Sequence, residues 1–348
     1  MELGLFFDLP PRDGDSHAPT FAEALRHVDI AESCGLDSVW IAERHFQPNR
    51  SLCSAPMVLA AAVAGRTKRI KIGTAVNVLP LYNPVRLAEE VATLDNLCQG
   101  RFEFGVGRSS GEGAYKGFKV PYMESQHRFD ECLDVLIKAM TTDRLTHKGA
   151  FYAFDNIAVV PRPLQKPHPP MRIAVTSPAS FAWAGQRGLP IFLGLNAPSA
   201  VLKPRIESYK QAWHDAQRPG APDVCLRLPV HVAPTTQAAL DEPKDSAMNF
   251  YTKIMPAQNT PIAGLSDEEN LQRVARADKH RAMTYDDVLR NHLVAGTPEG
   301  VADRLLALKE ELSLSSAIAD VNFGGMTPGP ALDRSFRLLA EHVTPKLK

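Results

Sequence analysis

The sequence lacks an excess of either charge, and it has few cysteines. Its 39 basic and 39 acidic residues give a formal net charge of zero, so no basic surface field exists to attract nucleic acid or an anionic membrane. The five cysteines are scattered without C-x-x-C spacing, which argues against structural zinc and against a disulfide framework. These absences favour a neutral small-molecule ligand, no bound metal and a reducing compartment.

Targeting and membrane signals are also missing. The apolar run from Leu3 to Phe7 has no basic region before it and no cleavage site after it, and no apolar stretch is long enough to cross a bilayer. We therefore expect a cytoplasmic protein without a membrane partner.

A nucleotide-binding motif is also incomplete, because Gly105-Val106-Gly107 lacks the full dinucleotide-binding fingerprint.

A recurring unit is present instead: a short apolar strand, a polar break and an amphipathic helix, repeated about eight times along 348 residues. This alternation predicts a parallel sheet with strands buried on both faces. Because closure removes the sheet edges, eight units favour a (β/α)₈ TIM barrel, an α/β fold, formed as one domain by residues 1–348. Its site should then lie at the C-terminal ends of the strands.

The predicted elements follow from the apolar periodicity and from proline or hydroxyl residues at helix starts. The expected strands are 2–8, 37–42, 70–79, 101–107, 171–176, 190–194, 224–232 and 317–323. The expected helices are 21–34, 56–66, 84–97, 126–142, 178–187, 200–216, 298–311 and 331–343. Two stretches, 145–169 and 237–291, do not fit the repeat and are expected to be loop insertions on the catalytic face, the second either a lid or a surface excursion.

Charged residues follow the second predicted strand at Glu43-Arg44-His45. In a pocket with little water, His45 can exchange protons near neutral pH, while Glu43 orients it or pairs with Arg44. The alternative is a salt-bridged strand end with a satisfied histidine, and these residues alone favour it.

Three further segments place small or hydroxyl residues at strand ends. Arg108 follows a glycine-containing strand and has an anion-gripping side chain, although a plain glycine-rich turn is the more frequent explanation. Thr176, Ser177 and Ser180 surround a helix start that can bind phosphate, whereas Ser177 can also be an ordinary N-cap. The Gly73-Thr74-Ala75-Val76 segment leaves room for a flat ring or packs tightly inside the barrel.

In order along the chain, these segments resemble the luciferase-like flavin-dependent monooxygenase family over nearly the whole length. No single motif is diagnostic, but the ordered set is specific. The matching stretches are Glu2 to Phe7, Glu32 to Trp40, Glu43 to Phe46, Gly73 to Ala75, Leu79-Pro80, Asn83 to Arg86, Gly100 to Phe102, Arg108, Ala182 to Ala184, Gly188 to Pro190, Gly296 to Glu299 and Val343 to Lys348.

The resemblance implies FMN, in its reduced form FMNH₂, lying across the strand ends. It places the phosphate at Arg108, Thr176, Ser177 and Ser180. It also implies that Ala75, between Thr74 and Val76, meets the ring through its backbone and carries a cis peptide to Val76; a regular trans strand is the alternative. O₂ would react through a C4a-peroxyflavin and oxygenate a small organic substrate, with the protein supplying position and dryness.

The chain departs from the family's luciferases at two places. Those proteins have two adjacent histidines, the first of them catalytic, where this chain has Arg44 and His45. Arginine cannot be a general base at neutral pH, but it can stabilise a peroxide or a substrate anion. Thr176 replaces an acidic neighbour of the phosphate, which should favour binding of a dianion.

Partners and rival functions follow from the same likeness. Because no nucleotide-fingerprint domain is present, reduced flavin is expected from a separate NAD(P)H-dependent flavin reductase. Family members commonly pair through helices near the start of the barrel, so a homodimer is expected. The rival functions are a deazaflavin (F420)-dependent hydride-transfer enzyme and a catalytically silent flavin-binding protein.

Overall fold

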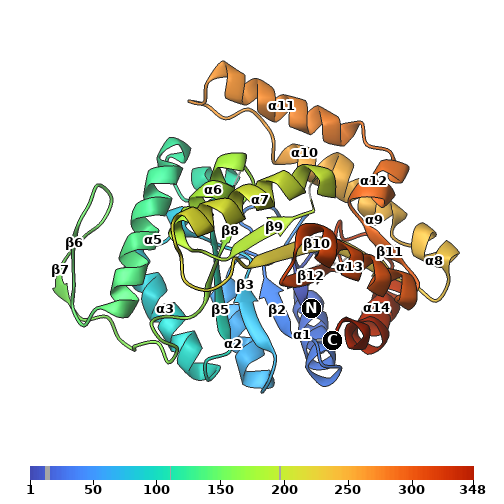
Figure 1. The fold of residues 1–348 in the computed structure, drawn as a ribbon, viewed down its shortest axis with the longest axis horizontal. Coiled ribbons are helices and arrows are strands. Elements are labelled where there is room, and N and C mark those ends of the chain that lie inside the picture. Colours follow the sequence, from blue (N-terminus) through green and yellow to red (C-terminus); the bar gives the residue numbers. More distant parts are fainter. Residues whose placement is uncertain (12–15, 110, 196) are drawn as a thin grey trace.

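A closed ring of eight parallel strands forms the centre of the protein (Figure 1). The computed structural model describes residues 1–11, 16–109, 111–195 and 197–348. The ring strands are β1 (Glu2–Phe7), β2 (Ser38–Ile41), β3 (Lys71–Thr74), β5 (Phe102–Gly107), β8 (Met171–Ala174), β9 (Ile191–Gly194), β10 (Val224–Val232) and β12 (Ser316–Asp320). Each pairs with the next in this order, and β12 pairs with β1 to close the ring. The predicted barrel and its eight strands are confirmed.

Helices on the outside of the ring cover the strands, as the repeat predicts. They are α1 (Ala18–Ser33), α2 (Pro56–Arg66), α3 (Pro84–Leu97), α5 (Ser125–Thr141), α6 (Pro178–Arg187), α7 (Ser199–Asp215), α13 (Pro298–Leu312) and α14 (Gly329–Leu338). The bounds of α2, α3 and α6 agree with the prediction because each begins at a proline, whose fixed φ suits the first helical position.

The inside of the barrel is filled by a small buried cluster, separate from the larger core between strands and helices. Phe6, Trp40 and Phe192 belong to this cluster, and the rings of Trp40 and Phe192 meet edge to face. A Cβ atom on Gly73 would lie 2.2 Å from Cε3 of Trp40, so the indole requires glycine there. The barrel is therefore closed below the strand ends, and chemistry must take place at its mouth.

The third predicted strand, 70–79, is interrupted. It forms β3 and the short β4 (Asn77–Val78), and the peptide bond from Ala75 to Val76 between them is cis, as predicted. This segment lies against β5, where a Cβ on Gly105 would be 1.8 Å from the carbonyl oxygen of Thr74. A Cβ on Gly107 would be 2.4 Å from a methyl of Val76. The two glycines of β5 thus make room for a backbone bulge at the mouth.

The first insertion differs from the prediction in its place. Residues 145–169 connect α5 to β8, not a strand to the helix after it, and they contain the antiparallel hairpin β6 (Leu145–Lys148) and β7 (Ala153–Ile157). The hairpin extends outside the barrel beside α5 (Figure 1). Glu131 of α5 accepts hydrogen bonds from the backbone N–H groups of residues 150–152, which fixes the tip of the hairpin.

The second insertion does follow a strand end, but it is helical. It contains α8 (Thr236–Asp241), α9 (Lys244–Asn249), a π-helical turn (Phe250–Ile254), α10 (Met255–Ala257), α11 (Asp267–Arg281) and α12 (Tyr285–Asn291) before the short strand β11 (Val294–Gly296). Phe250, Tyr251 and Val288 form a small core with Phe323. The polar composition of this segment predicts little buried apolar surface, which is wrong for these parts; in α11, by contrast, only Arg273 and Ala277 are buried.

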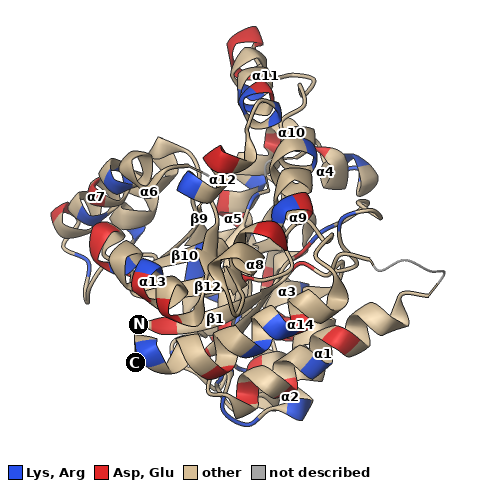
Figure 2. Cartoon of the chain, turned by 90° about the vertical axis from the view of Figure 1, so that its right-hand side faces the viewer, with Lys and Arg blue, Asp and Glu red and all other residues tan. Residues whose placement is uncertain are grey.

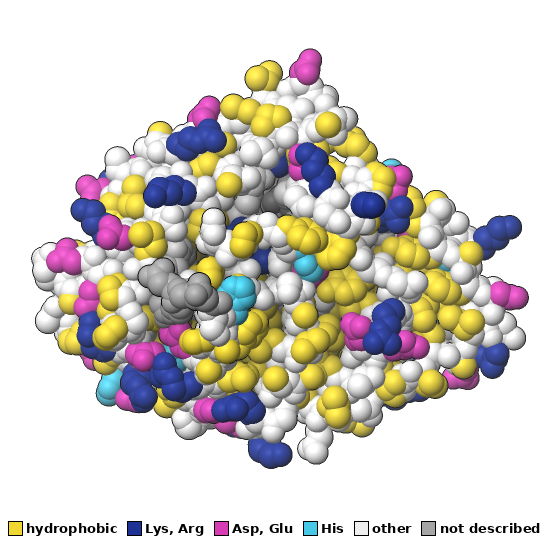
Figure 3. Space-filling model, turned by 180° about the vertical axis from the view of Figure 1, so that it is seen from behind, with side chains coloured by type: hydrophobic (Ala, Val, Ile, Leu, Met, Phe, Trp, Pro, Cys, Tyr) yellow, Lys and Arg dark blue, Asp and Glu magenta, His cyan; other side chains and the backbone are white. Residues whose placement is uncertain are grey.

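The surface carries both charges in comparable numbers. Lys and Arg alternate with Asp and Glu over the outer helices (Figure 2), in agreement with the zero net charge. From behind, hydrophobic side chains gather over the middle of the molecule and charged side chains lie mostly toward its edge (Figure 3). In the part of the chain that is described, no helix combines the length and apolar character needed to span a membrane.

Candidate active site

Glu43 is the centre of a buried hydrogen-bond network at the end of β2. Its Oε1 lies 2.7 Å from Nε2 of His45. Its Oε2 accepts hydrogen bonds from the backbone N–H of Val78 at 3.1 Å and from the hydroxyl of Tyr82 at 2.8 Å, with the amide of Asn77 at 3.3 Å. Of the two roles expected for Glu43, orientation of His45 is the one observed.

His45 is held from two directions. An ionised carboxylate can only accept, so Nε2 of His45 donates to Glu43 and Nδ1 keeps the lone pair. The imidazole meets the ring of Phe118 edge to face, with 4.8 Å between the ring centres. Its side chain is 12% exposed. This arrangement fixes the tautomer and leaves one nitrogen able to accept a proton.

Arg44 belongs to a different group from His45. Its Nε lies 3.5 Å from Oδ2 of Asp8, which directly follows β1. Arg50 reaches the same oxygen at 3.4 Å. Arg227, on β10, forms an ion pair with Asp320 at the end of β12, and its guanidinium lies 3.9 Å from the centre of the Phe6 ring. We call Asp8, Arg44, Arg50, Arg227 and Asp320 the arginine cluster.

In the arginine cluster, burial and the neighbouring charges together shift the pKa values of the ionisable groups. Burial alone would raise the pKa of Asp8, but Arg44, Arg50 and Arg227 outweigh it and lower that pKa to about 2. Burial raises the pKa of Asp320, and Arg227 opposes this rise. Burial and the neighbouring Arg44 lower the pKa of Arg50 to about 10.

Sequence reasoning identified Arg44 in this cluster and missed the other four residues. One signal was available: Arg227 interrupts the apolar strand Val224–Val232, and Asp320 ends another. Charges inside buried strands are costly without partners, so these two were candidates for a pair.

The predicted platform for a ring is the bulge at Thr74 to Val76. The hydroxyl of Thr74 donates to the carbonyl of Gly105 at 2.9 Å and accepts from the N–H of Gly105 at 3.1 Å. The N–H of Ala75 donates to the carbonyl of Ile41 at 2.7 Å. The Thr74 hydroxyl and the Ala75 N–H are therefore satisfied by the two neighbouring strands, whereas Oδ1 of Asn77 has no partner among the described residues.

The predicted phosphate residues form a turn, Thr176 to Ser180, that opens α6. Ser177 is the N-cap, and its hydroxyl accepts from the N–H of Ser180 at 3.4 Å. The Ser180 hydroxyl donates to the carbonyl of Ser177 at 2.6 Å and accepts from the N–H of Thr176 at 3.1 Å. Thr176 and Ser177 are exposed. The ordinary N-cap is therefore present, on a turn that faces solvent.

One arginine contacts this turn, and another follows the neighbouring strand. Arg108 follows β5, the neighbour of β8 in the ring, and its guanidinium donates to the hydroxyl of Ser125 at 3.0 Å. Arg205, on α7, donates to the carbonyl of Thr176 at 3.1 Å. The sequence reasoning missed Arg205, because a helix residue carries no local sign that it reaches a strand end. Ser110, considered as a further donor, lies outside the described residues.

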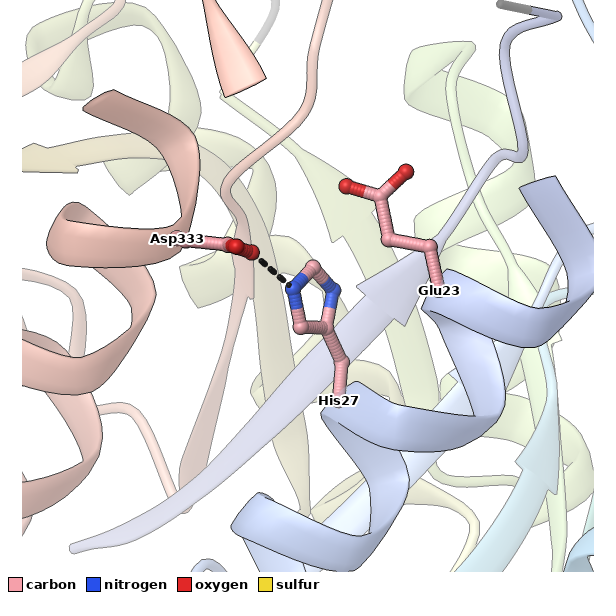
Figure 4. Close-up of side chains that lie close together, drawn as sticks. All are labelled: Glu23, His27 and Asp333. Atoms are coloured by element: carbon pink, nitrogen blue, oxygen red, sulfur yellow. Dashed lines mark hydrogen bonds and ion pairs between the residues drawn. The ribbon is translucent and has the colours of Figure 1, made fainter. Parts of the chain in front are cut away.

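One group of potential metal ligands lies away from the mouth. Glu23 and His27 on α1 approach Asp333 on α14, with their ligand atoms within 4.8 Å of one another (Figure 4). Asp333, however, accepts hydrogen bonds from Arg26 at 2.9 and 3.1 Å and lies 2.9 Å from Nε2 of His27. Its charge is already compensated, so this group joins two helices.

Comparison with known proteins agrees with this fold and identifies the family. The luciferase-like monooxygenase family model matches residues 1–315. The chain is 34% identical over 271 residues to the alkanal monooxygenase alpha chain of Photorhabdus laumondii, covering 76% of this chain and 71% of that one. It is 26% identical over 323 residues to the oxygenase component of the flavin-dependent trigonelline monooxygenase of Acinetobacter baylyi, covering 88% and 85%. Its matches to two uncharacterized proteins of Sinorhizobium fredii, 37% and 32% identical, span about half of their length.

Solved structures share the fold at lower identity. The oxygenating constituent of 3,6-diketocamphane monooxygenase from Pseudomonas putida, in complex with FMN, superposes with a TM-score of 0.82 at 21% identity and covers 100% of this chain and 99% of its own. An F420-dependent secondary alcohol dehydrogenase superposes with a TM-score of 0.77 at 19% identity, with the same coverage. The fold alone does not distinguish an FMN-dependent enzyme from an F420-dependent one. The family model and the sequence relatives, however, point to the same family. The chain belongs to the luciferase-like monooxygenase family.

Proposed function

We propose that the protein is an FMNH₂-dependent monooxygenase that uses O₂ to oxygenate a small organic substrate. The observation that carries this proposal is the bulge at Thr74 to Val76, for which Gly105 and Gly107 leave room. In the order of the strands it lies between the arginine cluster, which includes residues after β1 and β2, and the exposed turn after β8. A planar ring with a phosphate tail on one side and a polar reacting edge on the other matches this order.

The residues around the phosphate turn fit a phosphorylated flavin. Arg108, Thr176, Ser177 and Ser180 would hold the phosphate, because a helix start offers free N–H groups and a partial positive charge. Arg205 adds a second cation beside Thr176. The backbone at Thr74, Ala75 and Val76 would support the ring, since Ala75 has a small side chain.

The charged groups at the end of β2 divide the remaining tasks. Glu43 fixes the tautomer of His45, so Nδ1 is the nitrogen that can accept or return a proton. Arg44 stabilises negative charge and does not act as a base. When bound, reduced flavin supplies the electrons that activate O₂; this chain binds, orients, excludes water and moves a proton at His45.

The deciding experiment mixes the purified protein with photoreduced FMN in air-saturated buffer and follows the visible absorbance. We expect an absorbance change that decays much more slowly than in protein-free FMN solution. His45→Ala and Arg44→Ala should alter its decay or substrate turnover while FMN affinity remains. Full activity in both variants would assign these residues a structural role.

Reduced F420 is the matched control for the rival function. If the protein binds reduced F420 more tightly than FMNH₂ and gives no slow absorbance with FMN, hydride transfer replaces oxygenation as its function. Tight FMN binding without any oxygen-dependent signal would support the catalytically silent alternative.

We also propose a separate reductase and a homodimer. The trigonelline relative is named as an oxygenase component, which supports reduced flavin arriving from another NAD(P)H-dependent protein. The outer face of α2 supports self-association, because Val58 is 72% exposed and Ala61, Ala62 and Gly65 are exposed beside it. Sedimentation should give a dimer that Val58→Glu converts to monomer; a monomeric parent would contradict the pairing.

A further inference from the structure

The arginine cluster holds more buried hydrogen-bonding capacity than its own residues use. The side chains of Arg44, Arg50 and Arg227 are only 22, 10 and 17% exposed. Among the described residues, Nε of each of these arginines has no hydrogen-bond partner, although Nε of Arg44 lies 3.5 Å from Oδ2 of Asp8. The same is true of Oδ1 of Asp8, whose side chain is 10% exposed. Buried polar groups without partners are uncommon in native proteins and call for an explanation.

The neighbouring acceptors cannot supply the missing partners. Asp320 is engaged by Arg227, and Asp8 uses Oδ2 for Arg44 and Arg50. Glu43 is close in sequence, but both of its oxygens are already bound to His45, Asn77, Val78 and Tyr82. Three guanidinium groups therefore share two carboxylates. A further anion would offset the electrostatic repulsion between the three positive charges.

Free space lies directly in front of two of these arginines. A small pocket that opens to solvent lies there, with about 380 Å³ of space when the solvent at its opening is included, and Glu43, Arg44, His45 and Arg50 line one side of it. Ser109 and Ala114, after β5, and Gln258, from the second insertion, line its other side. A ligand in this pocket would meet the guanidinium groups and the imidazole assigned to proton transfer.

We propose that Arg44 and Arg50 bind a carboxylate of the organic substrate in this pocket. Asp8 does not line the pocket, but its Oδ2 contacts both arginines, so a donor on the adjacent carbon would extend past the guanidinium groups to the unpartnered Oδ1. This inference rests on the proposed function, and it names the substrate class: a carboxylate carrying a hydroxyl or amino group. A planar guanidinium matches a carboxylate in two-point contacts. Arg227 is a positioning residue, since it pairs with Asp320 and balances Asp8. The neutral ligand expected from the zero net charge of the whole chain is replaced by an anionic one, because local charge governs recognition.

Three related probes test the proposal: phenylacetamide, phenylacetate and mandelate. Calorimetric titration of the full chain, with and without FMN, should show phenylacetate binding at least tenfold more tightly than the neutral amide. Mandelate, which adds a hydroxyl beside the carboxylate, should bind several-fold more tightly than phenylacetate. Equal affinities for the acid and the amide overturn the proposal.

Variants locate the effect. Arg50→Gln and Arg44→Gln should remove most of the preference for the acid, whereas Arg86→Gln, an exposed arginine of α3, should keep it. Arg50→Lys retains the charge and should keep part of the preference, so it serves if Arg50→Gln does not fold. Loss of FMN affinity in step with loss of phenylacetate affinity would assign the cluster to the flavin and overturn the proposal.

The outcome separates this inference from the proposed function. A preference for phenylacetate over the amide without an oxygen-dependent absorbance change would support the anion site and contradict the monooxygenase function. A slowly decaying absorbance change with FMN but no preference for the acid would support the monooxygenase function and contradict the anionic substrate.

Discussion

The two sides of the barrel mouth offer positive charge in opposite ways. On the side of β5 and β8, the turn proposed to bind phosphate is exposed and offers a helix start, with Arg108 after the neighbouring strand. On the side of β1, β2, β10 and β12, the arginine cluster is buried and relies on full side-chain charges. An exposed site can exchange a cofactor with another protein, whereas a buried site can select a substrate, because desolvated charges interact strongly and tolerate few partners.

Removing Arg227 should cause the largest effect on the buried side. Its partner Asp320 is 2% exposed, and an unpaired buried carboxylate costs about 3–5 kcal/mol. Urea unfolding of Arg227→Met should show a loss of this size, and Arg227→Lys should lose less because it keeps the charge. A loss below about 1 kcal/mol would mean that Asp320 does not depend on this pair.

Asp8 should make the stability of the protein depend on acid pH. Its folded pKa is lowered to about 2, so between pH 4 and pH 2 the unfolded chain takes up a proton that the folded chain does not. Stability must then fall as pH falls through this window, by about 2.5 kcal/mol in total. Unfolding curves of Asp8→Asn should lack this part of the slope. An unchanged slope would show that other carboxylates dominate.

Substitution of Arg108 should weaken FMN binding and leave the free energy of unfolding nearly unchanged, in contrast to substitutions in the arginine cluster. Arg108→Ala should weaken FMN binding by about 2 kcal/mol, or roughly thirtyfold, because one charge-assisted contact to the phosphate is lost. Riboflavin, which has no phosphate, should bind the variant and the parent equally in a fluorescence titration. Equal losses for both flavins would contradict the phosphate assignment.

The same contrast explains what the sequence revealed. The fold was predictable because each strand and helix carries its own periodicity and start signal, as Pro56, Pro84 and Pro178 illustrate. The turn from Thr176 to Ser180 was predictable because its residues are contiguous, and its role at a phosphate remains a prediction. The arginine cluster was not predictable. Its residues are spread from Asp8 to Asp320 along the chain, and they meet only when β12 pairs with β1 and closes the ring.

The helices of the second insertion were missed although the sequence contained their signals. Ser266 with Glu269 and Thr284 with Asp287 form capping boxes that open α11 and α12. The polar composition of the segment suggested loops, yet a polar helix is stable when it is well capped and packed at one end. The hairpin of the first insertion was missed because its place depends on Glu131, in another helix.

The smallest expected effect concerns α11, the element through which the buried side can close. Arg273 of α11 donates to the carbonyl oxygens of Gln258 and Thr260, and Gln258 lines the pocket in front of Arg44 and Arg50. The helix buries little else, so its local unfolding should require little free energy. A ligand that fixes Gln258 should therefore slow trypsin cleavage at Lys279 and Arg281 about threefold, since a bound ligand lowers the population of the open form. Mandelate with FMN should give this protection and FMN alone should not, while cleavage at Lys148 in the β6–β7 hairpin should stay constant as the internal control. Cleavage of α11 at one rate under all conditions would separate the insertion from the site and leave the pocket without a moving cover.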